Sequence, residues 1–192
     1  LVLHGNAVGG GSVVYANTLL VPPEKVWRSG TWALLRDWAA EMPEHYRTAE
    51  KMLGVTTNPL LADADHMLKK LADEAGVGGS FYRTRVAVYF GADDEHAQPQ
   101  QQGDPYFAGK GPARAPCIGC GGCMVGCRHR AKNSLDYNYL YLAEKLGVKV
   151  LAESRVSHIE PLDKQDKGHT GWRVTVKPFK QPEQHFTAQN VI

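Results

Sequence analysis

Four cysteines lie within eleven residues of one another, and the chain contains no others. They are Cys117, Cys120, Cys123 and Cys127, with the spacing C-x2-C-x2-C-x3-C. Thiolates are soft ligands that suit iron–sulfur clusters and zinc, and this spacing is used to hold an iron–sulfur cluster. The glycines between them would let the loop curl so that several sulfurs converge. The pattern predicts either a metal or iron–sulfur site at these residues or a structural or redox thiol loop.

Two features of the cysteine run keep its chemistry open. In ferredoxin-type runs the last cysteine binds a second cluster and precedes a proline, whereas here Arg128 follows Cys127. One iron–sulfur cluster, a zinc site, and free or paired thiols are all compatible with these residues. A non-catalytic iron–sulfur electron-transfer module is therefore one hypothesis for the chain.

The second candidate site is the glycine-rich stretch at 5–12, which ends in Gly9-Gly10-Gly11-Ser12. Consecutive glycines allow a positive φ and a close approach of the backbone to a ligand. Such loops can present backbone N–H groups to phosphates. The stretch is neither G-x-G-x-x-G nor a Walker A loop, since no Gly-Lys-Ser/Thr follows. From its spacing alone, a tight turn and a nucleotide-binding loop are both compatible.

The composition is that of an ordinary globular protein. Of 192 residues, 43% are hydrophobic and 22% charged, and the formal net charge is +2. This weak charge predicts no nucleic-acid partner, and the basic run at 128–132 is expected to flank the cysteines. No apolar run reaches the roughly 18 residues of a transmembrane segment. Clustered rather than dispersed cysteines favour a reducing, cytoplasmic location.

The periodicity of apolar residues predicts helices and strands around the two sites. The expected helices are 31–53, interrupted at Pro43, then 59–75 and 134–146, the last capped by Ser134. The expected strands are 81–90, 148–151, 156–162, 172–179 and 186–192. This order predicts an α/β fold class with α+β elements, in which an antiparallel β-meander follows a helix–strand unit.

The helix at 59–75 has the clearest signals. Asn58 is expected to cap it, Pro59 to occupy its first position and Gly76 to end it. Its apolar residues form one stripe, which predicts a face buried in the core. They are Leu60, Ala64, Met67, Leu68, Leu71, Ala72 and Ala75.

The glycine-rich stretch and the residues after it, 5–17 followed by Pro22, resemble the first signature of the glucose–methanol–choline (GMC) family of flavin oxidoreductases. The similarity is greatest to the cholesterol-oxidase branch. In that family the segment wraps FAD along its pyrophosphate and isoalloxazine. The family usually has Asn or His where this chain has Tyr15. In this chain an Asn comes two residues later, at Asn17. The cofactor-binding residues that the resemblance implies here are Gly9, Gly10, Gly11, Ser12, Tyr15 and Asn17.

Two further segments resemble the same family. Val156, within 153–159, matches a valine whose backbone contacts the adenine of FAD. The cysteine run, read as C-x2-C-G-x-C-x2-G-C-x-H-x-A-K-N, resembles a segment of cholesterol-oxidase-like and long-chain-alcohol-oxidase-like members. That likeness does not indicate what the cysteines bind.

The resemblance implies an internal fragment of an FAD-dependent oxidoreductase acting on CH–OH groups. The substrate would be an alcohol, such as the 3β-hydroxysteroid cholesterol, and the electron acceptor oxygen or a redox carrier. The implied fold is a partial FAD-binding Rossmann-like domain plus part of a substrate-binding domain. The family's catalytic residues match no position here, so no catalytic residue is expected. The implied division is an FAD-binding segment at 1–29, a substrate-domain region at 30–116, the cysteine-rich loop at 117–133, and the FAD-domain helix, strand and meander at 134–192.

Overall fold

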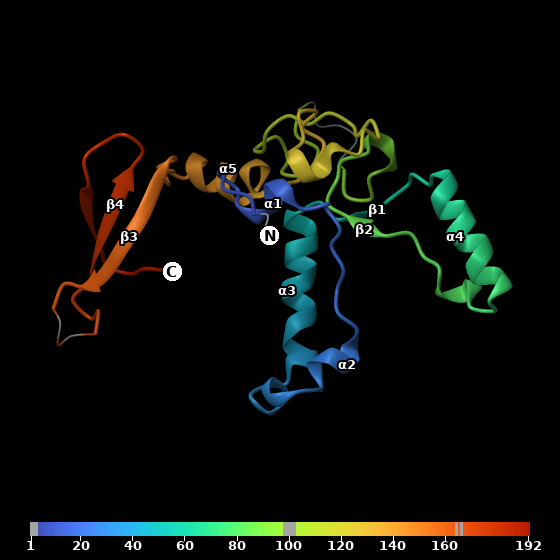
Figure 1. Cartoon of the computed structure of the whole chain (residues 1–192), viewed down its shortest axis with the longest axis horizontal. Helices are drawn as coiled ribbons and strands as arrows, with labels where there is room; N and C mark the ends of the chain where they lie inside the picture. The colour runs from blue at the N-terminus through green and yellow to red at the C-terminus, as the bar shows by residue number, and fades with distance from the viewer. Residues whose placement is uncertain (1–3, 98–102, 164, 166) are drawn as a thin grey trace. The chain divides into compact units, whose positions relative to one another are not determined.

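The computed structural model of the chain describes residues 4–97, 103–163, 165 and 167–192. The chain divides into two compact units, Leu1–Val148 and Lys149–Ile192 (Figure 1). Among the described residues, the first unit contains all the helices and the second contains a three-stranded sheet.

Most helices of the first unit are short. The α-helices are α1 Gly11–Val14, α2 Glu24–Trp27, α3 Trp38–Met52, α4 Asp63–Glu74 and α5 Tyr139–Lys145. The 3₁₀ helices are η1 Thr31–Leu34, η2 Gly78–Ser80, η3 Gly91–Asp93, η4 Gly122–Val125 and η5 Leu135–Tyr137. None of the helices in the described parts of the chain is long and apolar enough to cross a membrane.

The centre of the first unit is a small antiparallel arrangement of extended chain. Strand β1 (Thr56–Thr57) pairs with β2 (Arg85–Val86), and Val88 forms an isolated bridge with Lys132. The strand predicted at 81–90 is therefore only partly formed. Around these strands lies a cluster of buried hydrophobic side chains, and three partly buried side chains pack against it. The buried members are Val86, Val88 and Ala131, and the packed ones are Phe90, Cys117 and Cys127.

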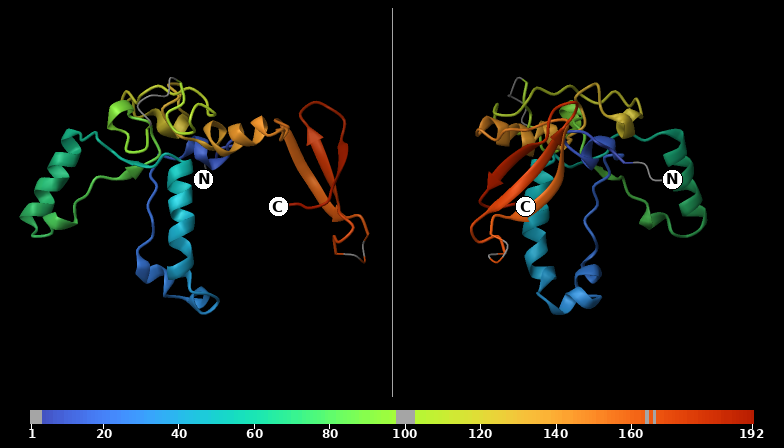
Figure 2. Two further views of the ribbon diagram at one scale, coloured as in Figure 1. Left: turned by 180° about the vertical axis from the view of Figure 1, so that it is seen from behind. Right: turned by 60° about the vertical axis from the view of Figure 1, so that its left-hand side comes forward.

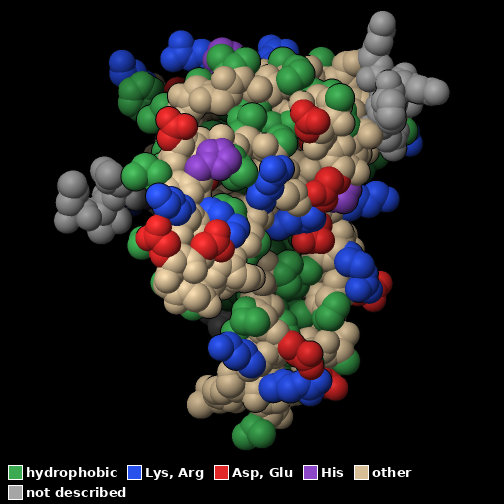
Figure 3. Space-filling model, turned by 90° about the vertical axis from the view of Figure 1, so that its right-hand side faces the viewer, with side chains coloured by type: hydrophobic (Ala, Val, Ile, Leu, Met, Phe, Trp, Pro, Cys, Tyr) green, Lys and Arg blue, Asp and Glu red, His purple; other side chains and the backbone are tan. Residues whose placement is uncertain are grey.

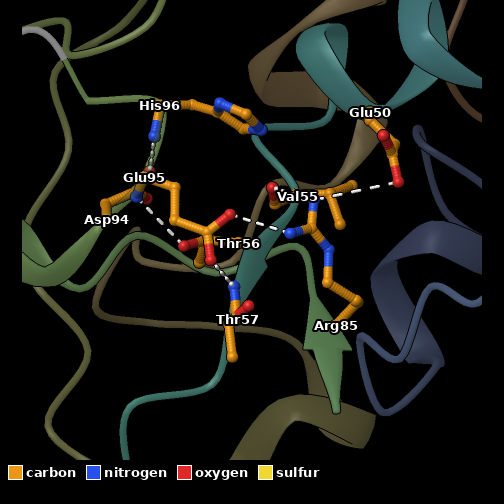
Figure 4. A network of polar contacts seen from close by, with 8 residues as sticks. All are labelled: Glu50, Val55, Thr56, Thr57, Arg85, Asp94, Glu95 and His96. Carbon is orange, nitrogen blue, oxygen red and sulfur yellow. Dashed lines mark hydrogen bonds and ion pairs between the residues drawn. The ribbon is translucent and has the colours of Figure 1, made fainter. Parts of the chain in front are cut away.

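A polar network fastens the loop after β2 to β1 (Figure 4). The Glu95 carboxylate accepts the Thr57 backbone N–H at 3.0 Å and an Arg85 N–H at 2.8 Å. In return, the Glu95 backbone N–H donates to the Thr56 hydroxyl at 3.0 Å. The second guanidinium nitrogen of Arg85 donates to the Val55 carbonyl at 3.1 Å. These bonds supply hydrogen-bond partners for backbone groups that the two-residue strands β1 and β2 cannot pair between themselves.

Helix α3 differs from its prediction at both its start and its proline. The Asp37 carboxylate accepts the Ala40 backbone N–H at 3.3 Å and caps the helix at Trp38, so 31–34 forms the separate turn η1. Pro43 lies inside α3 without interrupting it. A proline inside a helix removes one intrahelical hydrogen bond and crowds the carbonyl four residues before it, and the other bonds of this 15-residue helix carry it past Pro43.

The predicted start of α4 is wrong. The Asn58 carboxamide oxygen accepts the Leu60 backbone N–H at 3.0 Å, which forms a local turn rather than a helix cap. The helix begins at Asp63, after the Ala62 backbone N–H has donated to the Asp65 carboxylate at 2.8 Å. Asparagine side chains compete for nearby backbone groups in this way, so the helix begins four residues after the predicted first position, Pro59.

The predicted burial of the α4 stripe is also wrong for this chain. Met67 is 73% exposed, Leu71 62% and Leu68 57%. The periodicity found an apolar face correctly, but no described element covers it. Periodicity reports which residues share a face, whereas burial depends on what packs there.

The last helix of the first unit is shorter than predicted. Ser134 precedes the 3₁₀ turn η5, and α5 starts only after Asn138, whose side-chain oxygen accepts the Tyr139 backbone N–H at 2.6 Å. The segment 148–151 is not a strand, which corrects that prediction.

The second unit confirms the predicted antiparallel meander. Strands β3 (Ser154–Pro161), β4 (Trp172–Pro178) and β5 (Gln184–Ala188) pair in the order β3-β4-β5. Figure 2 shows them as one twisted antiparallel ribbon. The register shifts between Val156 and His158, where β3 bulges. Strand β5 ends at Ala188, before the predicted end at 192.

Together these elements make an α+β fold. Every strand pair among the described residues is antiparallel. The parallel Rossmann-like sheet therefore stays a prediction.

Candidate functional site

The glycine-rich stretch forms a turn with one open side. Gly9 and Gly10 have φ values of 101° and 56°, a region that favours glycine. A Cβ placed on Gly10 or Gly11 would meet no other atom within 4 Å, whereas one on Gly9 would lie 2.9 Å from Val13. Gly9 is thus needed for packing, while Gly10 and Gly11 leave their backbone open to a close-approaching group.

Ser12 fastens this turn from the inside. Its hydroxyl donates to the Gly9 carbonyl at 2.6 Å and accepts the Leu135 backbone N–H at 2.9 Å. The first bond closes the turn on itself, and the second holds α1 against η5. The hydroxyl of Ser12 therefore shapes the loop, and the cofactor contact implied for Ser12 stays a prediction.

Asp136, beside the same turn, was not singled out by the sequence. Its Oδ1 atom is buried and has no hydrogen-bond partner among the described residues. The same oxygen lies 3.4 Å from where a Cβ on Gly9 would be. No motif surrounds Asp136, so only the fold indicates its place beside the glycines.

Tyr15 and Asn17 lie between the turn and the core. Burial, and secondarily the Cys123 thiol, raise the pKa of the Tyr15 hydroxyl, which keeps it neutral. Asn17 is 8% exposed, has a φ of 60°, and accepts the Ala87 backbone N–H at 3.0 Å through its carbonyl. Asn17 thereby joins the segment after α1 to the central strands.

Lys132 is the main residue that sequence reasoning missed. It is 1% exposed, and its Nζ donates to the carbonyls of Tyr15, Val13 and Cys123 at 2.6, 3.0 and 3.0 Å. The ammonium also lies 4.5 Å from the centroid of the Tyr15 ring. Burial lowers its pKa, which the Cys123 and Cys127 thiols and Asp136 partly offset. One lysine thus joins the glycine segment to the cysteine loop.

The four cysteines occupy different environments. Cys117 and Cys127 pack against the hydrophobic core, Cys123 is half-buried, and Cys120 is exposed. The Gly119 backbone N–H donates to the Cys117 sulfur at 3.4 Å. In the described residues, no three His, Cys, Asp or Glu side chains form a group that could hold a metal ion. The iron–sulfur and zinc hypotheses gain no support from this arrangement, whereas core packing of two thiols fits a structural loop.

The two core-packed thiols differ in their electrostatics. Burial is the main effect on Cys117 and raises its pKa. Burial also acts on Cys127, but the backbone N–H groups of 129–132 point to its sulfur and together lower its pKa. Of these two thiols, Cys127 is the better stabilised as a thiolate.

Val156 belongs to the second unit and is considered within it. It lies on β3 opposite Val176 and is 50% exposed. It precedes the bulge, where the strand changes register. An exposed backbone beside a bulge is open to a partner, and the adenine contact implied for Val156 stays a prediction.

An apolar groove lies beside α4. Figure 3 shows the side of the molecule that is on the right in Figure 1, where hydrophobic side chains lie among charged ones. The volume of the groove is about 540 Å³. The exposed stripe of α4 forms one wall and the segment 77–84 the other. The apolar side chains that line it include Leu60, Leu61, Leu68, Leu71, Val77 and Phe81.

Comparison with known proteins shows close relatives. The chain is 51% identical, over its whole length, to a protein named cholesterol oxidase from Acinetobacter baumannii. It is 48% identical, over 83% of its length, to a protein of the same name from Mycobacterium tuberculosis (strain CDC 1551 / Oshkosh). The chain spans 35% and 28% of these relatives. No protein-family model matches it.

Proposed function

Because this chain belongs to the GMC oxidoreductase family, in its cholesterol-oxidase-like branch, we propose that it forms part of the FAD site of an enzyme that oxidises an alcohol. The observation that carries the proposal is the 51% identity to a cholesterol oxidase over the entire chain. When bound, FAD would accept a hydride from the carbon that bears the hydroxyl group. The base that takes the hydroxyl proton is expected outside these residues.

The glycine turn fits such a cofactor. A Cβ on Gly10 or Gly11 would meet no other atom within 4 Å, so a pyrophosphate could approach this side of the turn closely. The Gly10 N–H already donates to the Ala7 carbonyl at 2.8 Å, so Gly11 is the proposed donor of the two. Besides any contact with FAD, the neighbouring residues have structural roles. Gly9 and Ser12 shape the turn, while Tyr15 and Asn17 hold the segment that follows it. In the second unit, the backbone of Val156 is the proposed partner of the adenine.

The apolar groove beside α4 suits an alcohol with a large hydrocarbon body. Its volume of about 540 Å³ falls in the range of small-molecule sites. The apolar walls favour a sterol over a sugar, because they gain most from burying a hydrocarbon body. Polar side chains also line the groove, among them Asn58 and Tyr82, and could pair with the sterol hydroxyl. We propose a 3β-hydroxysteroid as the substrate, with oxygen or a redox carrier receiving the electrons.

The direct experiment uses the full gene product. Purified protein should show flavin absorbance, and anaerobic addition of a 3β-hydroxysteroid should bleach it. A preparation that binds no FAD even after reconstitution would sink the proposal. Bleaching by a short aliphatic alcohol but not by the steroid would keep the reaction class and reject the substrate.

A glycine variant tests the cofactor site itself. Gly11→Val places a side chain on the open face without a positive φ, so we expect FAD affinity to fall at least about tenfold while the apo-protein keeps its thermal midpoint. Gly79→Val is the matched control, because Gly79 has the same open surroundings. Equal FAD affinity in the two variants would remove the glycine turn from the site.

A further inference from the structure

Lys132 is a buried cation with an unusual set of partners. Its ammonium has three hydrogens, and three backbone carbonyls accept them. No carboxylate forms a salt bridge with it in the parts of the chain that the structure describes. A buried charge without a paired anion is costly, so these carbonyls and the Tyr15 ring must supply its stabilisation.

The positions of the three carbonyls explain what the lysine does. Helix α1 has only four residues, Gly11–Val14, so its last carbonyls have no intrahelical partner. The Lys132 ammonium satisfies the Val13 carbonyl at this end and the Tyr15 carbonyl just after it. A cation at a helix C-terminus is also favoured by the helix dipole. Without Lys132, these two part-buried carbonyls would lose the donor that they have here.

The backbone of Lys132 is itself fixed to the central strands. The Tyr89 N–H donates to the Ala131 carbonyl at 2.8 Å, and the Asn133 N–H donates to the Ala87 carbonyl at 2.9 Å. These bonds flank Lys132 on both sides. The Lys132 side chain thus extends from a backbone that is fixed by hydrogen bonds, and its ammonium fixes the carbonyls that it binds.

The third carbonyl, of Cys123, adds the cysteine loop to the same centre. A Cβ on Gly126 would lie 3.7 Å from the Val13 side chain, so the two segments also approach each other directly. The Lys132 ammonium is therefore shared between the segment after the glycine turn and the loop that carries the four cysteines.

We propose that Lys132 is a positioning residue of the flavin site: it holds Val13–Tyr15 in place and couples this segment to the cysteine loop. The proposal rests on the proposed function for its flavin role. In this proposal the cysteine loop helps to hold Val13–Tyr15 through its backbone. This role requires neither a bound metal nor thiol chemistry. The geometry places the coupling in one ammonium group.

The test compares Lys132→Met with two controls in the full gene product. Lys145→Met is matched in substitution, because Lys145 also lies over a tyrosine ring but is exposed and, within the described part of the chain, has no hydrogen bond to a carbonyl. Asp104→Ala also removes a buried side chain that serves three backbone groups, with a somewhat smaller expected loss of stability, but Asp104 lies outside the Lys132 centre. Lys132→Met should lower FAD affinity at least about tenfold and shift the visible flavin spectrum, whereas both controls should keep the affinity and the spectrum.

Hydrogen exchange gives a readout that does not need flavin. In Lys132→Met, amides of 11–17 and 119–127 should lose protection together, and neither control should show this paired loss. If the unaltered protein binds no FAD, the flavin role fails with the proposed function, and exchange alone decides the coupling. Unchanged exchange in both segments would overturn the coupling.

Lys132→Arg covers the case in which Lys132→Met does not fold. Arginine keeps the positive charge, but its planar fork cannot direct three N–H groups from one atom to these carbonyls. We expect it to fold and to show a smaller loss of FAD affinity with the same paired loss of protection. Wild-type affinity, spectrum and exchange in Lys132→Arg would reject the proposal.

Discussion

Lys132 and Asp104 are two buried residues that each serve three backbone groups, but over different distances in sequence. Lys132 is 1% exposed and reaches Val13 and Tyr15, which are 119 and 117 residues away. Asp104 is 2% exposed and accepts N–H groups no more than seven residues away. Those donors are Tyr106, Phe107 and Gly111, at 3.0, 3.1 and 2.7 Å.

The difference separates two ways of using a buried charge. Asp104 organises a turn of its own loop, so its loss should leave the rest of the unit in place. Lys132 joins segments that meet only in the folded protein, so its loss should release all of them at once. A buried charge that binds neighbouring backbone groups stabilises one turn, whereas a buried charge that binds distant backbone groups couples separate parts of a site.

The largest expected effect is on Lys132→Met. Its three carbonyls, which are part-buried, would lose their donor, so the free energy of unfolding should fall by about 2–4 kcal/mol. Urea unfolding of the full gene product measures this. A loss no greater than that of Lys145→Met would show that water replaces the ammonium without cost.

Asp104→Ala should be the next largest. Three backbone N–H groups lose their acceptor, and we expect a loss of about 1–3 kcal/mol in the free energy of unfolding. Hydrogen exchange should increase only around 104–111. Asp104→Asn keeps one acceptor oxygen and should lose less; a spread of exchange to 11–17 would contradict the contrast with Lys132.

Tyr15→Leu removes the ring above the Lys132 ammonium. A desolvated cation–π contact is worth about 0.5–2 kcal/mol, and we expect a loss of unfolding free energy in this range. Tyr15→Phe keeps the ring face and should retain most of the stability. In a double-mutant cycle, Tyr15→Leu should cost less when Lys132 is already Met; full additivity would mean that the ring and the ammonium do not interact.

The smallest expected effect is on the partly exposed Arg85–Glu95 pair in the network of Figure 4. The hydrogen bond from the Thr57 hydroxyl, then the Thr57 backbone N–H and Arg85, lower the pKa of Glu95. A lowered carboxyl pKa stabilises the fold above the unfolded-state pKa, and this contribution is lost as the pH falls through the folded-state value. Glu95→Gln should therefore cost less than about 1 kcal/mol at neutral pH.

The same variant has a pH signature. The stability difference between wild type and Glu95→Gln should shrink as the pH is lowered from about 7 to about 3. Added salt should reduce it at neutral pH, because the groups are partly exposed. For Lys132→Met the difference should be nearly independent of salt, and a strong salt dependence there would blur the distinction between buried and exposed charges.

The pattern of residues anticipated some elements well. The β-meander was predicted at 156–192 and forms at 154–188, because alternation and polar turns are local signals. The start of α4 was mispredicted because Asn58 favours a local turn that competes with a helix cap. Its apolar face was recognised, but its burial could not be inferred, because no local signal says which element covers a face.

The candidate site shows the same limit more sharply. The amino-acid order alone established a family resemblance, a glycine turn and a run of four cysteines. Only the tertiary structure placed Lys132 at their junction, because its partners are backbone carbonyls, which every residue carries and no sequence motif marks. Hydrogen bonds to carbonyls more than a hundred residues away are formed by chain packing, and that packing decided which lysine became the buried cation.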